Sequence, residues 1–443
     1  MVSKMARKRV LLFICFLGFI FSIHYIRKAS CNIIYGDYIR IVCNYLPDYY
    51  KINKYIHLDI LTRTPASFFI RLLNIKLFNF NTQADMVFGI VGSTIFIYVV
   101  IIYGIKSYIK FQYLLCIVLI GFGLNKWEMI LNGTGNIHFW AIALEAISFY
   151  QFDKTLCLKE DSYEIPTILA PPFITLFFAG DYCIPYLTSL LILCSALYFK
   201  TDFKRKVLLI GIIESIVLLI LYSISRFSAV YEIRNISGLS LIEIEKRDPL
   251  FFIKFIINAF GSSIYSIYST KPERLIVALL GIGLIIIYIY IIHKYIKNKL
   301  YLVSIFPFFL VCYSLISYIL IFIARYMFFD IEYGMSSRYQ IQYQMGTIGL
   351  ILIIQLLQRK KHFKIFYNCI ICIFLTGSIL SSITEYNMAI HRKNYCLDLI
   401  EKSYNLSDYT DENLETYFQY GDANKIRRAF EIIKEQHWNI YND

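Results

Sequence analysis

The sequence predicts an all-α protein that crosses a membrane many times. Hydrophobic residues make up 58% of its 443 residues and charged residues 17%, whereas soluble domains carry roughly 45–50% and about 25%. The apolar residues also form long runs, such as residues 10–26, 276–292 and 302–324. Each run approaches the ~20 residues that cross the hydrocarbon core of a bilayer. We therefore expect about eleven transmembrane helices.

The first expected span, residues 10–26, follows a basic N-terminus as a signal peptide would. Because the stretch ends in residues 23–28 without a small-x-small cleavage site, we expect an uncleaved transmembrane helix. The other expected spans are residues 86–103, 112–124, 138–151, 165–180, 183–199, 207–224, 274–293, 301–323, 341–357 and 365–382.

Basic residues predict the orientation of these spans. They gather in short loops at residues 106–110, 200–206, 294–299 and 359–364. These loops alternate with the N-terminus, so the positive-inside rule places all of them in the cytoplasm and the C-terminus in the periplasm of a bacterial inner membrane. Since the basic residues act as orientation signals, the net charge of +13 is no indication of nucleic-acid binding.

Most of the remaining chain is expected on the periplasmic side. We expect a transmembrane domain over residues 1–384, with long external loops at 27–85 and 225–273, and an external tail at 385–443. The apolar stretch 251–264 is predicted to be interfacial or re-entrant, because a full span there would reverse the loops that follow. Since function commonly lies in loops on a rigid scaffold, we expect a periplasmic site.

Three carboxylates in the first external loop are candidate catalytic groups: Asp37, Asp48 and Asp59. A carboxylate near the membrane surface can take the proton of an acceptor hydroxyl if it comes within hydrogen-bond reach. The alternative for each is a solvated turn residue.

Trp127 and Glu128 follow the third span. They are expected either to belong to the aromatic belt at the membrane surface or to line a cavity between helices. Glu145 and Glu214 lie within apolar spans, where carboxylates are costly and often functional.

External arginines oppose the charge rule and require a reason. Arg325 ends the ninth expected span, and Ser337, Arg338 and Tyr339 precede the tenth. Arginine binds phosphate oxygens in bidentate fashion, and serines at a helix N-terminus add donors for an anion. The alternative for Arg338 is a snorkelling side chain paired with Glu332.

Several segments of the sequence together resemble segments of polytopic GT-C-type glycosyltransferases. The length and the amino-acid composition of the chain resemble those of the phage-borne serotype-converting O-antigen glucosyltransferases. The segments, in chain order, are Trp127-Glu128-x4-Gly133, Phe177-Phe178-Ala179-Gly180, Phe255 to Ser262, Met335-Ser336-Ser337-Arg338-Tyr339 and Arg428 to Asn439. The resemblance covers most of the chain, and the order of the segments carries it.

The resemblance implies a GT-C-like fold and transfer of a sugar, glucose by that likeness, from a polyprenyl-phosphate donor such as undecaprenyl phosphate. The acceptor would be a lipid-linked O-antigen or similar surface glycan, and a donor-synthesising transferase and a small flippase would be partners. The implied roles are a base among Asp37, Asp48 and Asp59, phosphate ligands at Arg338, Arg325 and Arg71, and a cavity lined by Trp127, Glu128, Ser337 and Tyr339.

One departure concerns the catalytic carboxylate. Related proteins carry an acidic motif just before a stretch like Phe68 to Leu73, whereas residues 62–67 hold no acid here. His57 and Asp59 lie a few residues upstream and are the candidate substitutes. The cysteines are scattered and many lie in apolar runs, so we interpret them as small apolar residues, and a metal requirement stays open.

Two other functions remain as alternatives. An O-antigen polymerase or ligase would use arginines of the second long loop, where Arg226, Arg234 and Arg247 lie. A transporter or flippase would show two similar halves around Glu145 or Glu214, yet the sequence has no internal repeat. An enzyme should instead bring external carboxylates and arginines to one groove.

Overall fold

The computed structural model describes residues 4–46, 49–51, 65–157, 165–200, 204–228, 238–266, 271–358 and 364–442. Within these ranges every regular element is a helix. The α-helices are α1 (Lys4–Ala29), α2 (Asp37–Tyr45), α4 (Pro65–Phe78), α5 (Thr82–Lys106), α6 (Phe111–Gly121), α7 (Trp127–Leu131), α8 (Asn136–Cys157), α9 (Ile165–Lys200), α10 (Arg205–Ser228), α11 (Leu241–Arg247), α12 (Phe251–Ser262), α13 (Lys271–Lys297), α14 (Phe306–Arg325), α15 (Gln340–Leu357), α16 (Lys364–Tyr404), α17 (Asp411–Tyr417) and α18 (Ala423–Glu435).

Short 3-10 turns join several of these helices. They are η2 (Leu124–Lys126), η3 (Gly133–Gly135), η4 (Leu300–Leu302), η5 (Tyr326–Phe328), η6 (Ile331–Met335), η7 (Ser337–Tyr339), η9 (Leu406–Asp408) and η10 (Asn439–Tyr441).

The described helices define a polytopic helical membrane protein. Nine of those in the described ranges are long and apolar enough to cross a membrane. Helix α8 and the first half of α9 are not among the nine, although both pack in the same bundle. The all-α polytopic class is therefore confirmed, whereas the number of about eleven spans stays a prediction.

Helix α9 contains both the fifth and the sixth expected span. Although its 36 residues are helical throughout, the chain doubles back within it. Cys183 Sγ lies 3.8 Å from the carbonyl oxygen of Pro172, eleven residues earlier, whereas eleven residues of straight helix rise roughly 16 Å. The chain therefore bends sharply within α9, close to the boundary expected between the two spans.

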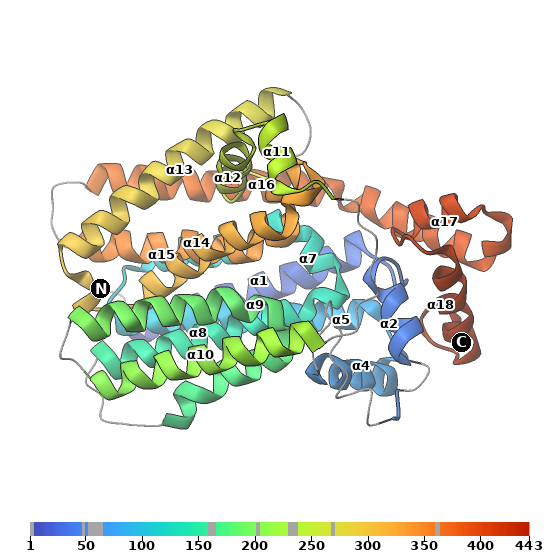
Figure 1. The fold of residues 1–443 in the computed structure, drawn as a ribbon, viewed down its shortest axis with the longest axis horizontal. Helices are drawn as coiled ribbons and strands as arrows, with labels where there is room; N and C mark the ends of the chain where they lie inside the picture. The colour runs from blue at the N-terminus through green and yellow to red at the C-terminus, as the bar shows by residue number, and fades with distance from the viewer. Residues whose placement is uncertain are drawn as a thin grey trace.

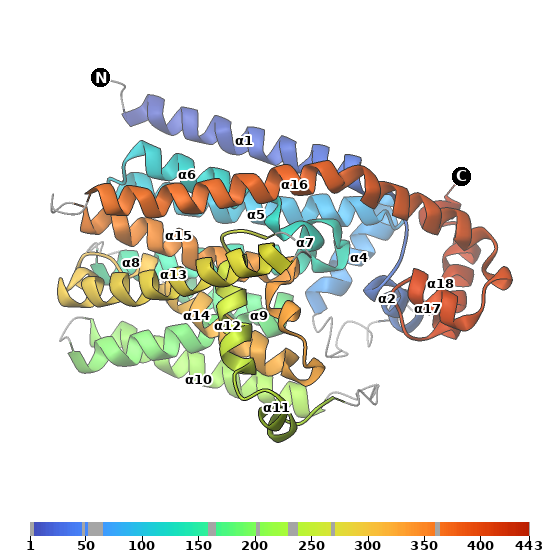
Figure 2. The same ribbon diagram turned by 90° about the horizontal axis from the view of Figure 1, so that it is seen from above.

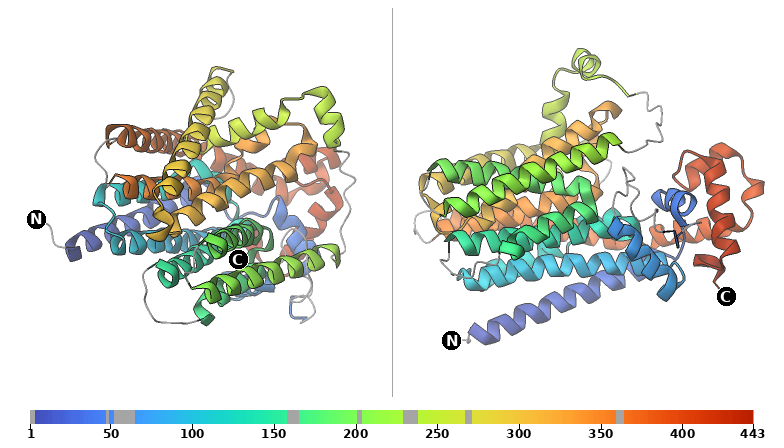
Figure 3. Two further views of the ribbon diagram at one scale, coloured as in Figure 1. Left: turned by 60° about the vertical axis from the view of Figure 1, so that its left-hand side comes forward. Right: turned by 60° about the horizontal axis from the view of Figure 1, so that its bottom comes forward.

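The long helices run together along the longest axis of the molecule (Figure 1). The N-terminus lies at one end of this bundle, while α2, α17 and α18 gather at the other, which two further views also show (Figures 2 and 3). The main apolar core lies between the long helices, and α15 is buried along its whole length. This arrangement fits the prediction that the two termini lie on opposite sides of a membrane.

A second, smaller core forms at the end away from the N-terminus. It joins apolar side chains of α2, the end of α16, α17 and α18. Helix α18 contributes one face, with Ile426, Phe430 and Ile433 buried, and Asp422 caps its first turn by accepting from the Lys425 amide at 3.0 Å. The described part of the first long loop and the tail, which are far apart in the sequence, therefore fold as one unit.

Two further helices bear on the expected boundaries. Helix α12 has twelve residues, too few to span a bilayer, and runs across the bundle rather than along it (Figure 2). Helix α16 has 41 residues and continues without a break past residue 384 into the tail. One rigid helix therefore links the bundle with the second core.

Candidate functional site

A cavity of about 480 Å³ lies where the bundle meets the second core. It brings together four of the residues expected in a site, Asp37, Trp127, Glu128 and Arg338, from three separate parts of the chain. The lining is completed by Ala29, Ser30, Tyr35, Gly36, Tyr38, Leu131, Asn132, Met388, His391, Arg392, Tyr395, Cys396 and Gln419.

The start of α7, which carries Trp127 and Glu128, is held by hydrogen bonds from a buried lysine. Lys126 Nζ donates to the carbonyl oxygens of Gly121 at 2.7 Å and Gly123 at 3.1 Å, and to Gln344 Oε1 at 3.0 Å. These bonds satisfy carbonyls at the end of α6 that the helix itself leaves unpaired. Because Gln344 belongs to α15, the lysine links α7 to the most buried helix of the bundle.

Glu128 and Arg338 form the charged centre of the cavity. Arg338 Nε donates to Glu128 Oε1 at 2.8 Å, and Nη2 pairs with the same oxygen. Ser336 and Ser337 donate to Glu128 Oε2 at 3.1 and 3.2 Å. Glu128 is thus saturated with donors, whereas the Arg338 side chain remains 48% exposed. The alternative pairing of Arg338 with Glu332 is not what the structure shows, because Glu332 pairs with Arg274.

Asp37 is the accessible carboxylate of the cavity. It begins α2 directly after Gly36, whose φ of 56° lies in the left-handed region that glycine adopts freely. Its side chain is 54% exposed, and its nearest ion-pair partner, Arg40 Nη2, is 3.9 Å away. Asp37 is therefore free to accept a proton or a hydrogen bond from a ligand in the cavity.

Tyr35 lines the same wall as Asp37. Desolvation, with smaller contributions from neighbours that include Glu128, raises the pKa of the Tyr35 phenol above its ordinary value. The phenol therefore stays protonated at neutral pH. It can hydrogen-bond a ligand but cannot serve as a base.

Helix α16 adds a second arginine that the sequence had not singled out. The Arg392 guanidinium stacks on the Trp127 indole, 3.1 Å from the ring centroid. Its Nε and Nη2 donate to the two Glu385 oxygens at 2.5 and 2.6 Å, and the Tyr25 hydroxyl donates to the same carboxylate at 2.5 Å. Arg392 therefore holds Trp127 in place, with its charge compensated by Glu385.

The structure places two other expected phosphate ligands away from the cavity. Arg325 Nε donates to the Tyr339 hydroxyl at 2.5 Å, and neither side chain lines the cavity. Arg71 is buried and pairs with Asp85 at 3.1 Å. Asp85 also accepts from the Tyr38 hydroxyl at 2.8 Å, so Arg71 supports the wall behind the cavity and does not face it.

Ser337 is buried and does not line the cavity, but it supports Glu128 from behind. Asp48, Asp59 and Arg234 lie outside the described residues, as does the side chain of Arg226. Arg247, also from the second long loop, lies 6.0 Å from the Phe329 ring centroid, and it is not a cavity residue.

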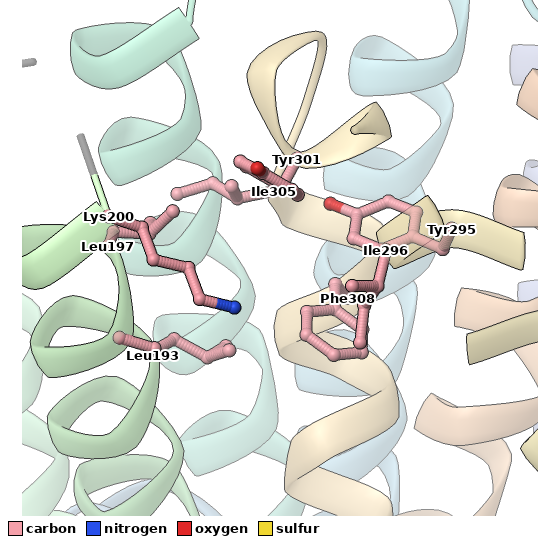
Figure 4. A pocket seen from close by; sticks show the side chains of 9 residues that line it. Leu193, Leu197, Lys200, Tyr295, Ile296, Tyr301, Ile305 and Phe308 are labelled. Atoms are coloured by element: carbon pink, nitrogen blue, oxygen red, sulfur yellow. The ribbon is translucent and has the colours of Figure 1, made fainter. Parts of the chain in front are cut away.

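A second pocket, of about 110 Å³, lies among the basic loops at the other end of the bundle. Its lining is apolar apart from Lys200 and two tyrosines, and Figure 4 shows the Lys200 side chain extending into it opposite Tyr295 and Phe308. It holds no carboxylate. Within the described residues, no group of three or more His, Cys, Asp or Glu side chains is arranged to hold a metal ion.

Fold and cavity together define the class of this molecule as a multi-pass helical membrane protein with a charged cavity at the end of the bundle opposite the N-terminus. No protein-family model matches the sequence, and neither curated proteins nor solved structures give a significant match.

Proposed function

We propose that this protein is a membrane glycosyltransferase of the bacterial inner membrane. It moves a sugar, with glucose as the working assignment, from a polyprenyl-phosphate donor to a lipid-linked O-antigen or similar surface glycan on the periplasmic side. The observation that carries the proposal is the convergence of Asp37, Glu128 and Arg338 on one cavity. A donor-synthesising transferase and a small flippase are the expected partners.

Asp37 is the proposed base. The acceptor hydroxyl oxygen attacks the anomeric carbon of the donor sugar as its proton passes to the Asp37 carboxylate. The bond between the anomeric carbon and the phosphate oxygen breaks, and polyprenyl phosphate leaves with the electron pair. The partial exposure of Asp37 and its long distance to Arg40 support this role, because a tightly paired carboxylate would be a poorer base.

Arg338 is the proposed ligand of the departing phosphate. A guanidinium carries five N–H donors, and Arg338 directs Nε and Nη2 to Glu128. The N–H donors that remain can bind phosphate oxygens, and Glu128 keeps the Arg338 guanidinium oriented toward the cavity. Glu128 is thus a positioning residue in this proposal.

The scaffold suits a lipid-borne donor. A periplasmic enzyme has no nucleotide sugar at hand, so its donor must arrive through the membrane. The cavity lies at the end of a bundle whose outer helices expose apolar side chains, among them Ile379 and Ile383 on α16, the helix that also carries the cavity residues Met388 and Arg392. A polyprenyl chain can lie along such a surface while its phosphate reaches Arg338.

The proposal is tested by comparing the lipopolysaccharide O-antigen of a host with and without this gene, by mass spectrometry and NMR, where the host makes the lipid-phosphate donor. We expect a new hexose branch on an unchanged backbone repeat. A change in chain length or in the linkage between repeats would instead identify a polymerase. An unchanged glycan in a host shown to carry both donor and acceptor would refute glycosyl transfer.

A further inference from the structure

Helix α4 buries two polar side chains on its inner side, beside Ile70 and Ile75, and is apolar on its outer side. Arg71 and Asn74 point inward and are 2% and 5% exposed. Phe69, Leu73 and Leu77, spaced by four residues on one face, are 57%, 42% and 68% exposed. A helix on the surface of a soluble protein shows the reverse pattern. This apolar stripe of Phe69, Leu73 and Leu77 therefore indicates an apolar medium outside.

The two inward polar side chains of α4, Arg71 and Asn74, each have a partner near the start of α5. Arg71 pairs with Asp85, while Asn74 exchanges two hydrogen bonds of 2.9 Å with the Asn81 backbone. Asp85 lies in the first turn of α5, and Asn81 directly precedes this helix. These bonds fix the rotation of α4 about its own axis, so the stripe cannot turn inward without breaking a buried ion pair.

The stripe continues an apolar surface of the bundle. Helix α4 packs on α5 and α9, and Ile70 joins a small cluster with Ile137 and Ala141 of α8. The first half of α9 itself exposes Phe173 and Phe177.

We propose that the stripe of α4 contacts the acyl chains of the lipid bilayer. Lys76, exposed beside the stripe, can extend its ammonium group to the lipid headgroups, as lysines at membrane surfaces do. This contact does not depend on the proposed enzymatic activity.

Lipid contact at α4 also sets the depth of the cavity. Arg71 on α4 and Tyr38 on α2 bind the same Asp85 oxygen. Tyr38 follows Asp37 in the chain, and both line the cavity. A bilayer that holds α4 therefore holds the candidate base at a defined height above the membrane.

The experiment uses the full-length protein in vesicles of phosphatidylethanolamine and phosphatidylglycerol. A nitroxide is coupled to an encoded ketone side chain at Leu73 or Leu77, which leaves the native cysteines untouched, and power-saturation EPR compares collisions with oxygen and with a water-soluble nickel chelate. Ile286, 60% exposed on α13, is the lipid reference. Glu431, exposed on α18, is the water reference.

We expect oxygen accessibility to exceed nickel accessibility at both positions, as at Ile286, with the opposite order at Glu431. Nickel accessibility equal to that at Glu431 would overturn the proposal, because the stripe would then face water. Low accessibility to both reagents would also overturn it, because another protein or a second copy would then cover the stripe.

Discussion

At the scale of single residues, the two carboxylates of the cavity differ in what they can do. Glu128 accepts from Arg338 and two serines, so it is occupied with orienting its neighbours. Among the described residues, Asp37 has one ion-pair partner, Arg40 at 3.9 Å, and it is half exposed. Asp37 is thus the loosely paired carboxylate and Glu128 the fully hydrogen-bonded one. This difference underlies the proposed roles of Asp37 as base and of Glu128 as positioning residue.

Replacing Asp37 by Asn should reduce glycosyl transfer by about 100-fold or more, because a general base typically contributes 10²–10⁴ in rate. The measurement is the initial rate of transfer in membranes that contain equal amounts of each variant. Asp408→Asn, at an exposed carboxylate of the tail outside the cavity, is the matched control and should keep the full rate. An unchanged rate in Asp37→Asn would remove Asp37 as the base.

Arg338→Ala should raise the KM for the lipid donor by about 10-fold or more, because charge-assisted bonds to phosphate contribute roughly 1.5–3 kcal/mol each. Arg338→Lys should retain part of the affinity for the donor, since lysine keeps the positive charge but cannot bind phosphate oxygens in bidentate fashion. Arg428→Ala, which removes an exposed arginine paired with Glu431, is the control. Equal donor affinity in all three variants would rule out the phosphate role.

The sequence singled out Asp37, Trp127, Glu128 and Arg338 because they are charged or aromatic residues expected close to the external membrane surface. Arg392 escaped prediction, since it lies in a run of mixed charge in the tail. Nothing in that run indicates that α16 continues beyond the membrane domain or that its Arg392 contacts Trp127. Such a contact depends on tertiary structure alone.

At the scale of elements, the wall behind the cavity is a close packing of α2, α5 and η3. Gly133 of η3 is the tightest point, because a Cβ there would lie 2.0 Å from the Tyr38 hydroxyl and 2.9 Å from the Thr82 carbonyl oxygen. The sequence revealed that a loop joins α6 and α8. It could not reveal that this loop packs on the start of α5.

Gly133→Ala should lower the free energy of unfolding by about 1–3 kcal/mol, as overpacking does, and should also slow transfer by moving Tyr38. Gly283→Ala is its matched control, because no atom lies within 4 Å of a Cβ at that position of α13. Thermal unfolding and transfer rates of both purified variants are the measurements. A Gly133→Ala protein as stable and active as Gly283→Ala would contradict the packing described.

The ion pair between Arg71 and Asp85 also belongs to this scale. Arg71→Met should destabilise the protein by about 3–5 kcal/mol, because it leaves a buried carboxylate without its cation. Arg427→Met removes a half-buried arginine from an exposed Asp411 and should cost about 1 kcal/mol or less. Similar melting temperatures for the two variants would show that Arg71 is not held in a buried pair.

At the scale of the whole molecule, hydropathy predicted the helical bundle well, because long apolar runs have few other stable structures in lipid. Its boundaries were predicted less well. The two spans expected within α9 are joined by helix, and α16 runs past the expected end of the membrane domain. Hydropathy detects where a helix leaves the bilayer but not where the helix itself ends.

The opposite positions of the two termini give a prediction of topology. Alkaline phosphatase fused after residue 443 should be active in cells, because that enzyme folds only in the periplasm. A fusion in the basic loop at residues 294–299 should be inactive, while green fluorescent protein at that position should fluoresce. The reverse pattern would invert the orientation and would place the cavity in the cytoplasm.

The central claim is tested most directly with the purified protein in vesicles that contain polyprenyl-phosphate-linked, radiolabelled glucose and a lipid-linked O-antigen repeat. We predict that label passes to the repeat and that polyprenyl phosphate is released in equal amount, and that both events are lost in Asp37→Asn. A donor that stays intact in the presence of folded protein, or label that crosses the bilayer still attached to its lipid, would contradict the claim.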